Sequence, residues 1–271
     1  LTKYSFKLLG HIGPHGFSEI LGGKVSTALI LINKTLPSTT EILYSYKLND
    51  IDYYQKEIYL KECINGKLPS RVFSLVIKKC LSIPKHPIAY WASDKLLNLL
   101  NSNISLGDMI ENANFTKTGN NDRFLRYYWE ISQESFNVGE RWIWITKGTS
   151  FSRWYGSCDT VVDWSEGAQF HYKKDKVSRI TKEEYIGISG LTYCTNSTLG
   201  LPFRFINRPG VSTYNSPQIF SKKLSNIFLL ALLNSRYATY VTRLLSGPLA
   251  VVIGDIQRIP CPYSLIDCKD F

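Results

Sequence analysis

The sequence predicts an α+β fold, and three observations lead to that prediction. Apolar residues make up 44% of the 271-residue chain and charged residues 20%, a balance typical of globular rather than disordered proteins. Short runs rich in β-branched and aromatic residues, such as residues 25–33 and 142–146, predict strands. Longer runs at residues 51–64 and 224–245 have the apolar spacing of helices, so both kinds of element are expected.

The N-terminal part is predicted to combine strands with one helix. Residues 25–33 form an apolar, β-branched run that predicts a buried strand. Residues 42–48 and 72–77 are two further strand candidates. Residues 51–64 predict a helix, with Gly66 as its stop signal.

A domain boundary is predicted in the segment that reads IPKHPIAYWA, residues 83–92. Its two prolines prevent a helix and favour an extended crossing. Ser93 follows as the expected cap of a helix at residues 94–101. The chain is therefore expected to divide into residues 1–85 and residues 86–271.

Residues 118–164 are the most distinctive stretch, because five of the six tryptophans lie there. Two polar turns that contain glycine interrupt the aromatic residues, at residues 118–123 and 147–151. Such turns expose backbone amides and short polar side chains on a rigid scaffold, which suits an approach to a phosphate or a base edge. Aromatic strands joined by Asn and Gly turns are equally the ordinary makeup of an α+β core. Composition alone leaves both interpretations open.

The second half is expected to be rich in short strands and to end in a helix. Residues 105–111 predict a short capped helix, and residues 171–184 are charged and predict an exposed connection. Residues 224–245 carry the clearest helical pattern of the chain. Strands are expected at residues 114–117, 126–131, 142–146 and 155–163.

The net charge of +10 favours an anionic partner, either nucleic acid or a membrane surface. Residues 201–260 are the most uneven part, with seven basic residues against the single acid Asp255. The sequence contains neither a secretory segment nor an apolar run long enough to cross a bilayer, so no membrane association is expected.

The six cysteines include no Cys-x-x-Cys pair, and none lies near a histidine at zinc-ligand spacing. Free thiols in a reducing cytoplasm account for them most simply, so we expect a cytoplasmic protein without a metal site. The acids Asp122, Asp159, Asp163 and Glu166 match no nuclease motif. The chain begins at Leu1 and its one methionine is Met109, so a piece of a longer protein is expected.

Three separated strings occur in the order TGNNDRFLRYYWE, KGTSFSRWYG and VVDW. They resemble the start of the target-recognition region of BREX-type (PglX-like) adenine-specific DNA methyltransferases, and of large restriction–modification methyltransferases related to them. IPKHPIAYWA resembles the junction between the two domains of that family, and VVIGDIQRIP resembles the close of the recognition domain. Two departures are Tyr193, where tryptophan is usual, and Ser246-Gly247-Pro248-Leu249, where an Asn-Pro-Thr-like string is usual.

The resemblance implies the end of an α/β methyltransferase domain in residues 1–85 and a mixed α+β target-recognition domain in residues 86–271. It implies double-stranded DNA and the N-terminal catalytic domain of the same protein as partners, in phage defence or restriction–modification. S-adenosylmethionine is the cofactor of the full-length family. The chain contains neither an Asn-Pro-Pro-aromatic tetrapeptide nor a glycine-rich cofactor turn, so alone it is expected to be inactive.

The candidate DNA contacts all lie in or just after the two polar turns. Asn and Arg can read base edges there, and Lys and Arg can neutralise phosphates. Each has a local alternative, such as a helix cap for Asn121 or an acidic partner for Arg153, and Trp154 is expected in the core rather than at the contact. The nine candidates are Thr118, Asn120, Asn121, Arg123, Lys147, Thr149, Ser150, Arg153 and Tyr155.

Two other functions remain open at this stage. The chain could be a stand-alone DNA-binding module that lends target choice to a separate enzyme. It could also be a remnant without DNA affinity.

Overall fold

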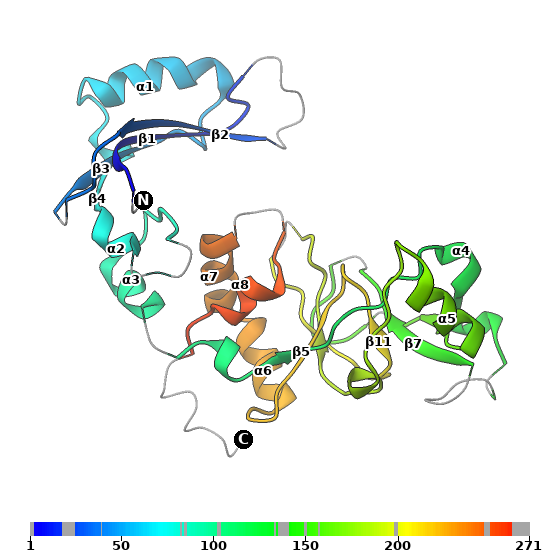
Figure 1. Cartoon of the computed structure of the whole chain (residues 1–271). Helices are drawn as coiled ribbons and strands as arrows, with labels where there is room; N and C mark the ends of the chain where they lie inside the picture. The colour runs from blue at the N-terminus through cyan, green and yellow to red at the C-terminus, as the bar shows by residue number, and fades with distance from the viewer. Residues whose placement is uncertain are drawn as a thin grey trace. The chain divides into compact units, whose positions relative to one another are not determined.

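The chain forms two compact units, Leu1–Asn101 and Ser102–Phe271. Both contain helices and strands, which confirms the predicted α+β class (Figure 1). The predicted assignment of residues 1–85 and 86–271 to two functional domains stays a prediction. The computed structural model describes residues 3–17, 25–38, 40–81, 83, 86–101, 104–132, 134, 141–148, 151–156, 158–197, 200–246 and 250–261.

A four-stranded sheet in the order β2-β1-β3-β4 forms the first unit. Its central strand β1 pairs antiparallel with β2 and parallel with β3, and β3 pairs antiparallel with β4. The predicted strands at 25–33, 42–48 and 72–77 are confirmed, whereas β1 was not predicted. The bounds are β1 (Ser5–Pro14), β2 (Ser26–Asn33), β3 (Ile42–Lys47) and β4 (Val72–Val76).

The helix α1 (Lys56–Ile64) follows a 3-10 turn, η1 (Tyr53–Gln55), so regular α-helix begins five residues later than predicted. Ile12, Leu48 and Cys63 form a buried cluster beneath α1. Lys56 donates to the carbonyls of Ile12 and Pro14 at 2.5 and 2.7 Å, which ties the start of α1 to the end of β1.

Short elements flank β4. The 3-10 turn η2 (Pro69–Arg71) precedes it, and the helices α2 (Ile77–Leu81) and α3 (Asp94–Leu100) follow it. The predicted cap of α3 is confirmed, because Ser93 Oγ accepts a hydrogen bond from the Leu96 amide at 3.3 Å.

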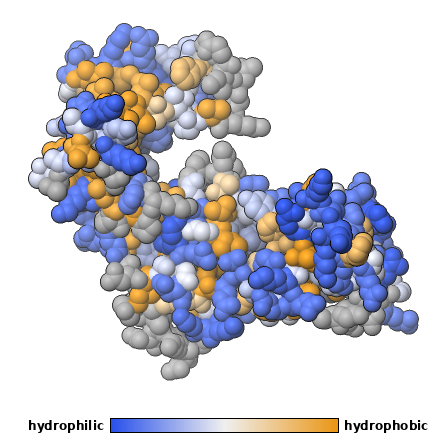
Figure 2. All heavy atoms as spheres, viewed as in Figure 1, coloured by the Kyte–Doolittle hydropathy of each residue, from blue (hydrophilic) through white to orange (hydrophobic). Residues whose placement is uncertain are grey.

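The strand β2 corrects one prediction, because it is exposed and not buried. Leu29, Ile30, Leu31 and Ile32 are each between 44% and 56% exposed. The physical reason is its place at the sheet edge, where β1 is its one paired neighbour. Figure 2 shows apolar residues at the surface of this unit. The apolar composition of residues 25–33 marks a surface that is suited to burial, but this chain does not bury it.

The second unit contains two four-stranded sheets. One has the order β10-β9-β12-β5 and is antiparallel throughout. Its strands are β5 (Glu111–Asn112), β9 (Leu191–Thr192), β10 (Arg204–Phe205) and β12 (Gln218–Phe220). The other has the order β11-β7-β8-β6, with β11 and β7 parallel. Its strands are β6 (Leu125–Tyr127), β7 (Trp142–Thr146), β8 (Thr160–Asp163) and β11 (Val211–Ser212).

The helix α5 (Glu166–Lys174) covers the second of these sheets and overlaps residues 171–184, which were predicted to be an exposed connection. That prediction is wrong in part, because Tyr172 is 2% exposed and packs on Phe124 and Trp164. The charged residues of this stretch face solvent, so its composition concealed a buried helical face. The cluster beneath α5 contains Phe124, Ile143, Ile145, Val162, Trp164, Ala168, Tyr172 and Val211.

The helix predicted at residues 224–245 is divided into α6 (Asn226–Leu233) and α7 (Arg236–Ser246). The side chain of Asn234 bonds both backbone groups of Phe203, at 3.1 and 3.0 Å. Ser235 Oγ accepts from the Ala238 amide at 3.1 Å and begins α7. Ser and Asn compete with helical backbone bonds in this way. The last helix of the described residues is α8 (Ile253–Gln257).

Several predicted elements are shorter than expected. Residues 114–117 form one isolated bridge, between Lys117 and Arg179, and not a strand. The strand at 126–131 ends early and gives way to a 3-10 turn, and β8 covers only the end of 155–163. The predicted strand at 142–146 is confirmed with the same bounds. The 3-10 turns are η3 (Leu106–Asp108), η4 (Tyr128–Glu130) and η6 (Glu183–Tyr185).

Candidate nucleic-acid interface

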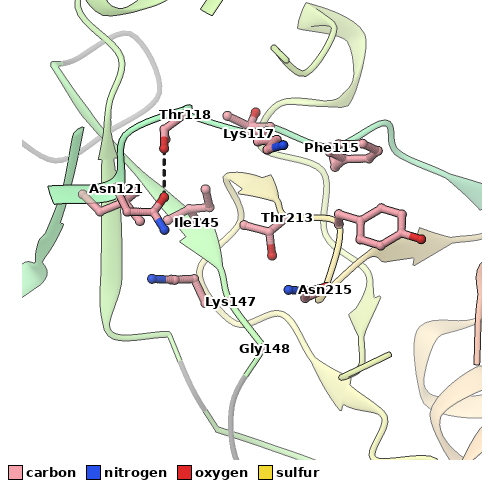
Figure 3. A pocket seen from close by; sticks show the side chains of 12 residues that line it. Phe115, Lys117, Thr118, Asn121, Ile145, Lys147, Gly148, Thr213 and Asn215 are labelled. Carbon is pink, nitrogen blue, oxygen red and sulfur yellow. Dashed lines mark hydrogen bonds between the residues drawn. The ribbon is translucent and has the colours of Figure 1, made fainter. Parts of the chain in front are cut away.

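The first polar turn is built around the short helix α4 (Asn121–Phe124). Asn120 caps it, since its Oδ1 accepts from the Arg123 amide at 3.1 Å. Thr118 is 3% exposed and donates its hydroxyl to Asn121 Oδ1 at 2.8 Å. The Asn121 oxygen is therefore occupied, and its amide nitrogen is directed away from Thr118 (Figure 3).

A brace beneath this turn fixes its position. Ser178 Oγ donates to the Thr118 carbonyl at 2.9 Å, and Lys117 and Arg179 exchange backbone hydrogen bonds. The Asp175 carboxylate accepts from the Ser178 hydroxyl and from the Ser178 and Val177 amides. These hydrogen bonds lower the pKa of Asp175, the Ser178 hydroxyl having the largest effect, so the brace is ionised at neutral pH.

The second polar turn begins where β7 ends. Thr146 Oγ1 donates to the Ser216 carbonyl at 3.0 Å, and Thr213 Oγ1 donates to the Thr146 carbonyl at 3.0 Å. These bonds join the end of β7 to residues 213–216 and hold Lys147 half-buried next to them. Thr149 and Ser150, two of the predicted contacts, lie outside the described residues.

The two turns and residues 213–215 surround a hollow of about 480 Å³ (Figure 3). A second hollow of about 340 Å³ shares Asn121, Leu125 and Lys147 with it. Asn121 and Lys147 thus lie between two cavities. The larger hollow is lined by Phe115, Thr116, Lys117, Thr118, Asn121, Leu125, Ile145, Lys147, Gly148, Thr213, Tyr214 and Asn215.

Sequence reasoning missed the contribution of residues 213–215. Tyr214 is 59% exposed, and its ring meets Phe115 edge-on with centroids 5.4 Å apart. The signal was a run of polar residues, TYNS, between two strands, which is a turn pattern like the two that were recognised.

Arg153 and Tyr155 line neither of these two hollows. Arg153 Nε donates to the Leu201 carbonyl at 3.3 Å, and its guanidinium lies 5.3 Å from the Phe151 ring. The Tyr155 ring is 65% exposed, and its hydroxyl accepts from Asn207 at 2.7 Å. The described candidates therefore lie at two places. Thr118, Asn121 and Lys147 line the hollows, and Arg153 and Tyr155 lie away from them.

Trp154 corrects a further prediction, since it is 53% exposed and not a core residue. Its backbone pairs with the chain at Phe203 and Phe205, and it adopts a left-handed φ of +72°. The pairing holds the backbone in register and leaves the indole at the surface. The cap of the first turn is Asn120, and not Asn121, the alternative considered from the sequence. Arg123 lies 4.8 Å over the Phe124 ring.

The scaffold beneath the turns is braced by a half-buried ion pair. Arg141 contacts Asp163 at 3.0 Å, and the Ser165 amide donates to the other Asp163 oxygen at 3.0 Å. Burial opposes ionisation of Asp163, but the hydrogen bonds from Ser165 and Arg141 outweigh it and lower its pKa. Both oxygens of this carboxylate are engaged in contacts that stabilise the scaffold.

Nothing in the described ranges resembles a metal or redox centre. No group of three or more His, Cys, Asp or Glu side chains there could hold a metal ion. The five described cysteines are free thiols, and the chain from 3 to 261 has, in its described ranges, no helix long and apolar enough to cross a membrane.

Comparison with known proteins finds similarity to adenine-specific methyltransferases, and the predicted resemblance is confirmed. The chain is similar to the C-terminal part of BREX-type methyltransferases of this kind. It is 26% identical over 269 residues to adenine-specific methyltransferase BrxX of Escherichia coli O9:H4 (strain HS), covering 96% of this chain and 21% of that protein. It is 27% identical over 277 residues to adenine-specific methyltransferase PglX of Lacticaseibacillus casei (strain Zhang), covering 93% and 22%.

The chain thus spans about a fifth of the length of these curated relatives. No family model matches it.

The residues that the structure describes do not fit S-adenosylmethionine. A nucleotide-type cofactor needs a strand, a glycine-rich turn and a helix N-terminus in succession. Here β1 ends in a Gly-Pro-His-Gly turn, but the next described element is β2, which runs back antiparallel. A Cβ at Gly13 would lie 2.6 Å from the Asn49 backbone, so this glycine serves close packing. No step of cofactor chemistry can be assigned to these residues.

Proposed function

We propose that residues 86–271 are the DNA target-recognition part of a site-specific adenine-N6 DNA methyltransferase. The relatives are adenine-specific methyltransferases, and the chain matches one end of them. One observation carries the proposal. Asn121 and Lys147, from two separate turns, converge between two hollows on a braced β-sheet scaffold.

Asn121 is the proposed reader of base edges. Its carbonyl oxygen is occupied by Thr118, so it offers its two N–H donors. Those donors match the acceptor atoms that purines and thymine present in the major groove. Thr118 is buried and acts by orienting Asn121, and Asn120 acts by capping α4.

Lys147, Arg123 and Arg153 are the proposed phosphate contacts, because each is a basic side chain close to a polar turn. Tyr155 has an exposed ring, and its hydroxyl can still donate a hydrogen bond while it accepts one from Asn207. Thr149 and Ser150 follow Lys147 directly and remain proposed contacts of the same loop.

Residues 1–85 are proposed to close the methyltransferase-like domain, which would supply S-adenosylmethionine binding and catalysis. The exposed apolar strand β2 supports this, because such a surface suits burial against further protein. The chain alone is therefore expected to transfer no methyl group. Methylation of DNA by the isolated chain, measured with radiolabelled S-adenosylmethionine, would contradict this.

A salt titration of DNA binding tests the recognition role. The chain should bind a fluorescent duplex with a steep log–log dependence on salt, measured by anisotropy. Lys147→Ala should reduce the slope by about one, while Lys222→Ala, a 79%-exposed lysine outside the hollows, serves as the control. A flat slope, or no binding at moderate salt, would favour a remnant without DNA affinity.

Selection from a random duplex library separates reading from positioning. Asn121→Ala should relax sequence preference and leave the salt slope unchanged, because it removes a base contact and no charge. Thr118→Val should give a weaker form of the same effect. Unchanged preference in both variants would exclude Asn121 as the reader.

A further inference from the structure

A stacked pair of aromatic rings projects next to the proposed DNA contacts. Tyr127 and Trp129 lie nearly parallel, with ring centroids 4.6 Å apart and planes 5° apart. They are 50% and 61% exposed. Because Tyr127 covers one face of Trp129, the exposure of the indole lies largely on its other side. An exposed aromatic patch of this kind marks a candidate interaction site.

The backbone that carries these rings is fixed. Tyr127 pairs with Thr160 at the end of β6, and the Tyr128 amide donates to the Asp159 carbonyl at 2.9 Å. The Glu130 carboxylate accepts from the Tyr127 amide at 2.7 Å and closes the 3-10 turn η4. The stack is therefore preorganised, and binding to it requires little further ordering.

The ring between them anchors the turn to the core. Tyr128 lies 5.7 Å from Trp144 of β7, and the Arg208 guanidinium lies 5.0 and 4.4 Å over these two rings. Tyr128 thus packs against the scaffold and is 38% exposed, whereas Tyr127 and Trp129 are more exposed. The three consecutive aromatics of the string YYW divide into one anchor and one outward pair.

The surroundings are polar. Tyr127 lines the smaller hollow together with Asn121, Arg126 and Lys147. Asp122 and Glu130 line it too, and the Glu130 carboxylate is already engaged with the Tyr127 amide. Figure 2 shows a predominantly hydrophilic surface around the α4 and α5 end of the molecule. A protein partner would bring aliphatic contacts, for which these neighbours are poorly suited.

We propose that the Tyr127–Trp129 pair is a stacking platform for an unstacked nucleobase of the bound DNA. This inference rests on the proposed DNA-recognition function and deepens it. A π-face accepts any base, and the adjacent cations hold the phosphates on either side. Asn121 and Lys147 line the same hollow as Tyr127, so they would lie next to the stacked base.

The test uses the 271-residue chain with two fluorescent duplexes, one fully paired and one with a central single-base bulge. The unaltered chain should prefer the bulged duplex, and binding should quench tryptophan fluorescence. Trp129→Ala and Tyr127→Ala should weaken binding to the bulged duplex about tenfold or more, without changing the salt slope, because stacking releases no counterions. Trp129→Phe should retain most of the affinity.

Tyr240→Ala is the matched control, since Tyr240 is also 50% exposed but lies on α7 outside both hollows. It should bind like the unaltered chain, and circular dichroism should show that every variant is folded. If Trp129→Ala binds DNA like the unaltered chain, the platform is excluded and the recognition function stands. If Trp129→Ala instead lowers the salt slope, the stacking proposal is likewise overturned. It is also overturned if Trp129→Ala loses association with the N-terminal part of the full-length protein while DNA binding persists. Absence of DNA binding by the unaltered chain would overturn both proposals.

Discussion

Gly119 shows how single residues shape the candidate interface. It adopts a left-handed φ of +75°, and a Cβ there would lie 2.5 Å from Ser178 Oγ. A side chain would therefore strain the turn and displace the brace beneath it.

We expect Gly119→Ala to destabilise the chain by about 1–2 kcal/mol and to weaken DNA binding, because Asn121 would lose its fixed position. Urea unfolding and anisotropy measure the two effects. Gly167→Ala is the matched control, because its Cβ would meet nothing within 4 Å and it lies in α5. That change should stabilise by about 0.5–1 kcal/mol. Equal effects of the two changes would exclude the strained-turn account.

Asp163 makes the stability of the scaffold dependent on pH. Its folded pKa is lowered below the roughly 3.9 of an unfolded chain. Its contribution is therefore present at neutral pH and is lost as the pH falls below about 4, through the folded pKa.

Asp163→Asn should cost about 2 kcal/mol at pH 7 and should flatten the loss of stability on acidification. Urea unfolding from pH 7 to pH 3 measures both. Glu57→Gln, which alters an exposed helix pair with Lys61, should change little. A variant that loses stability with pH as steeply as the unaltered chain would contradict this assignment.

Among the elements, the break between α6 and α7 depends on one side chain. Asn234 is 6% exposed and satisfies both backbone groups of Phe203, which is fully buried. The pattern of residues 224–245 is helical by hydrophobicity, but the tertiary partner decides where the helix stops.

Asn234→Ala should destabilise by about 2–4 kcal/mol, because it leaves a buried N–H and C=O without partners. Asn226→Ala, at the start of α6, is the comparison and should cost much less. Thermal and urea unfolding measure the difference. A cost below about 1 kcal/mol would mean that Phe203 finds other partners when Asn234 is absent.

At the scale of the whole molecule, β2 is the exposed apolar surface that suits association with further protein. Leu31 is 56% exposed in the centre of an edge strand, where an open row of apolar side chains favours association. A full-length protein would bury this strand if residues 1–85 close a larger domain.

Leu31→Glu should therefore leave the stability of the 271-residue chain within about 0.5 kcal/mol. The same change should reduce the thermal stability and yield of the full-length protein. Lys34→Gln, just beyond the strand, controls for the change in net charge. Equal stability of full-length Leu31→Glu and unaltered protein would show that β2 stays exposed.

The sequence by itself determined the α+β class, the strand at 142–146, the Ser93 cap and the relationship to adenine-specific methyltransferases. These follow from local patterns and strings, which do not depend on distant partners. Tertiary structure alone decided that residues 213–215 join the two turns, that Thr118 is buried beneath Asn121 and that Trp129 stands exposed. Each of these depends on contacts between residues distant in sequence, and hydrophobicity cannot distinguish an aromatic ring that is buried from one held at the surface by its neighbours.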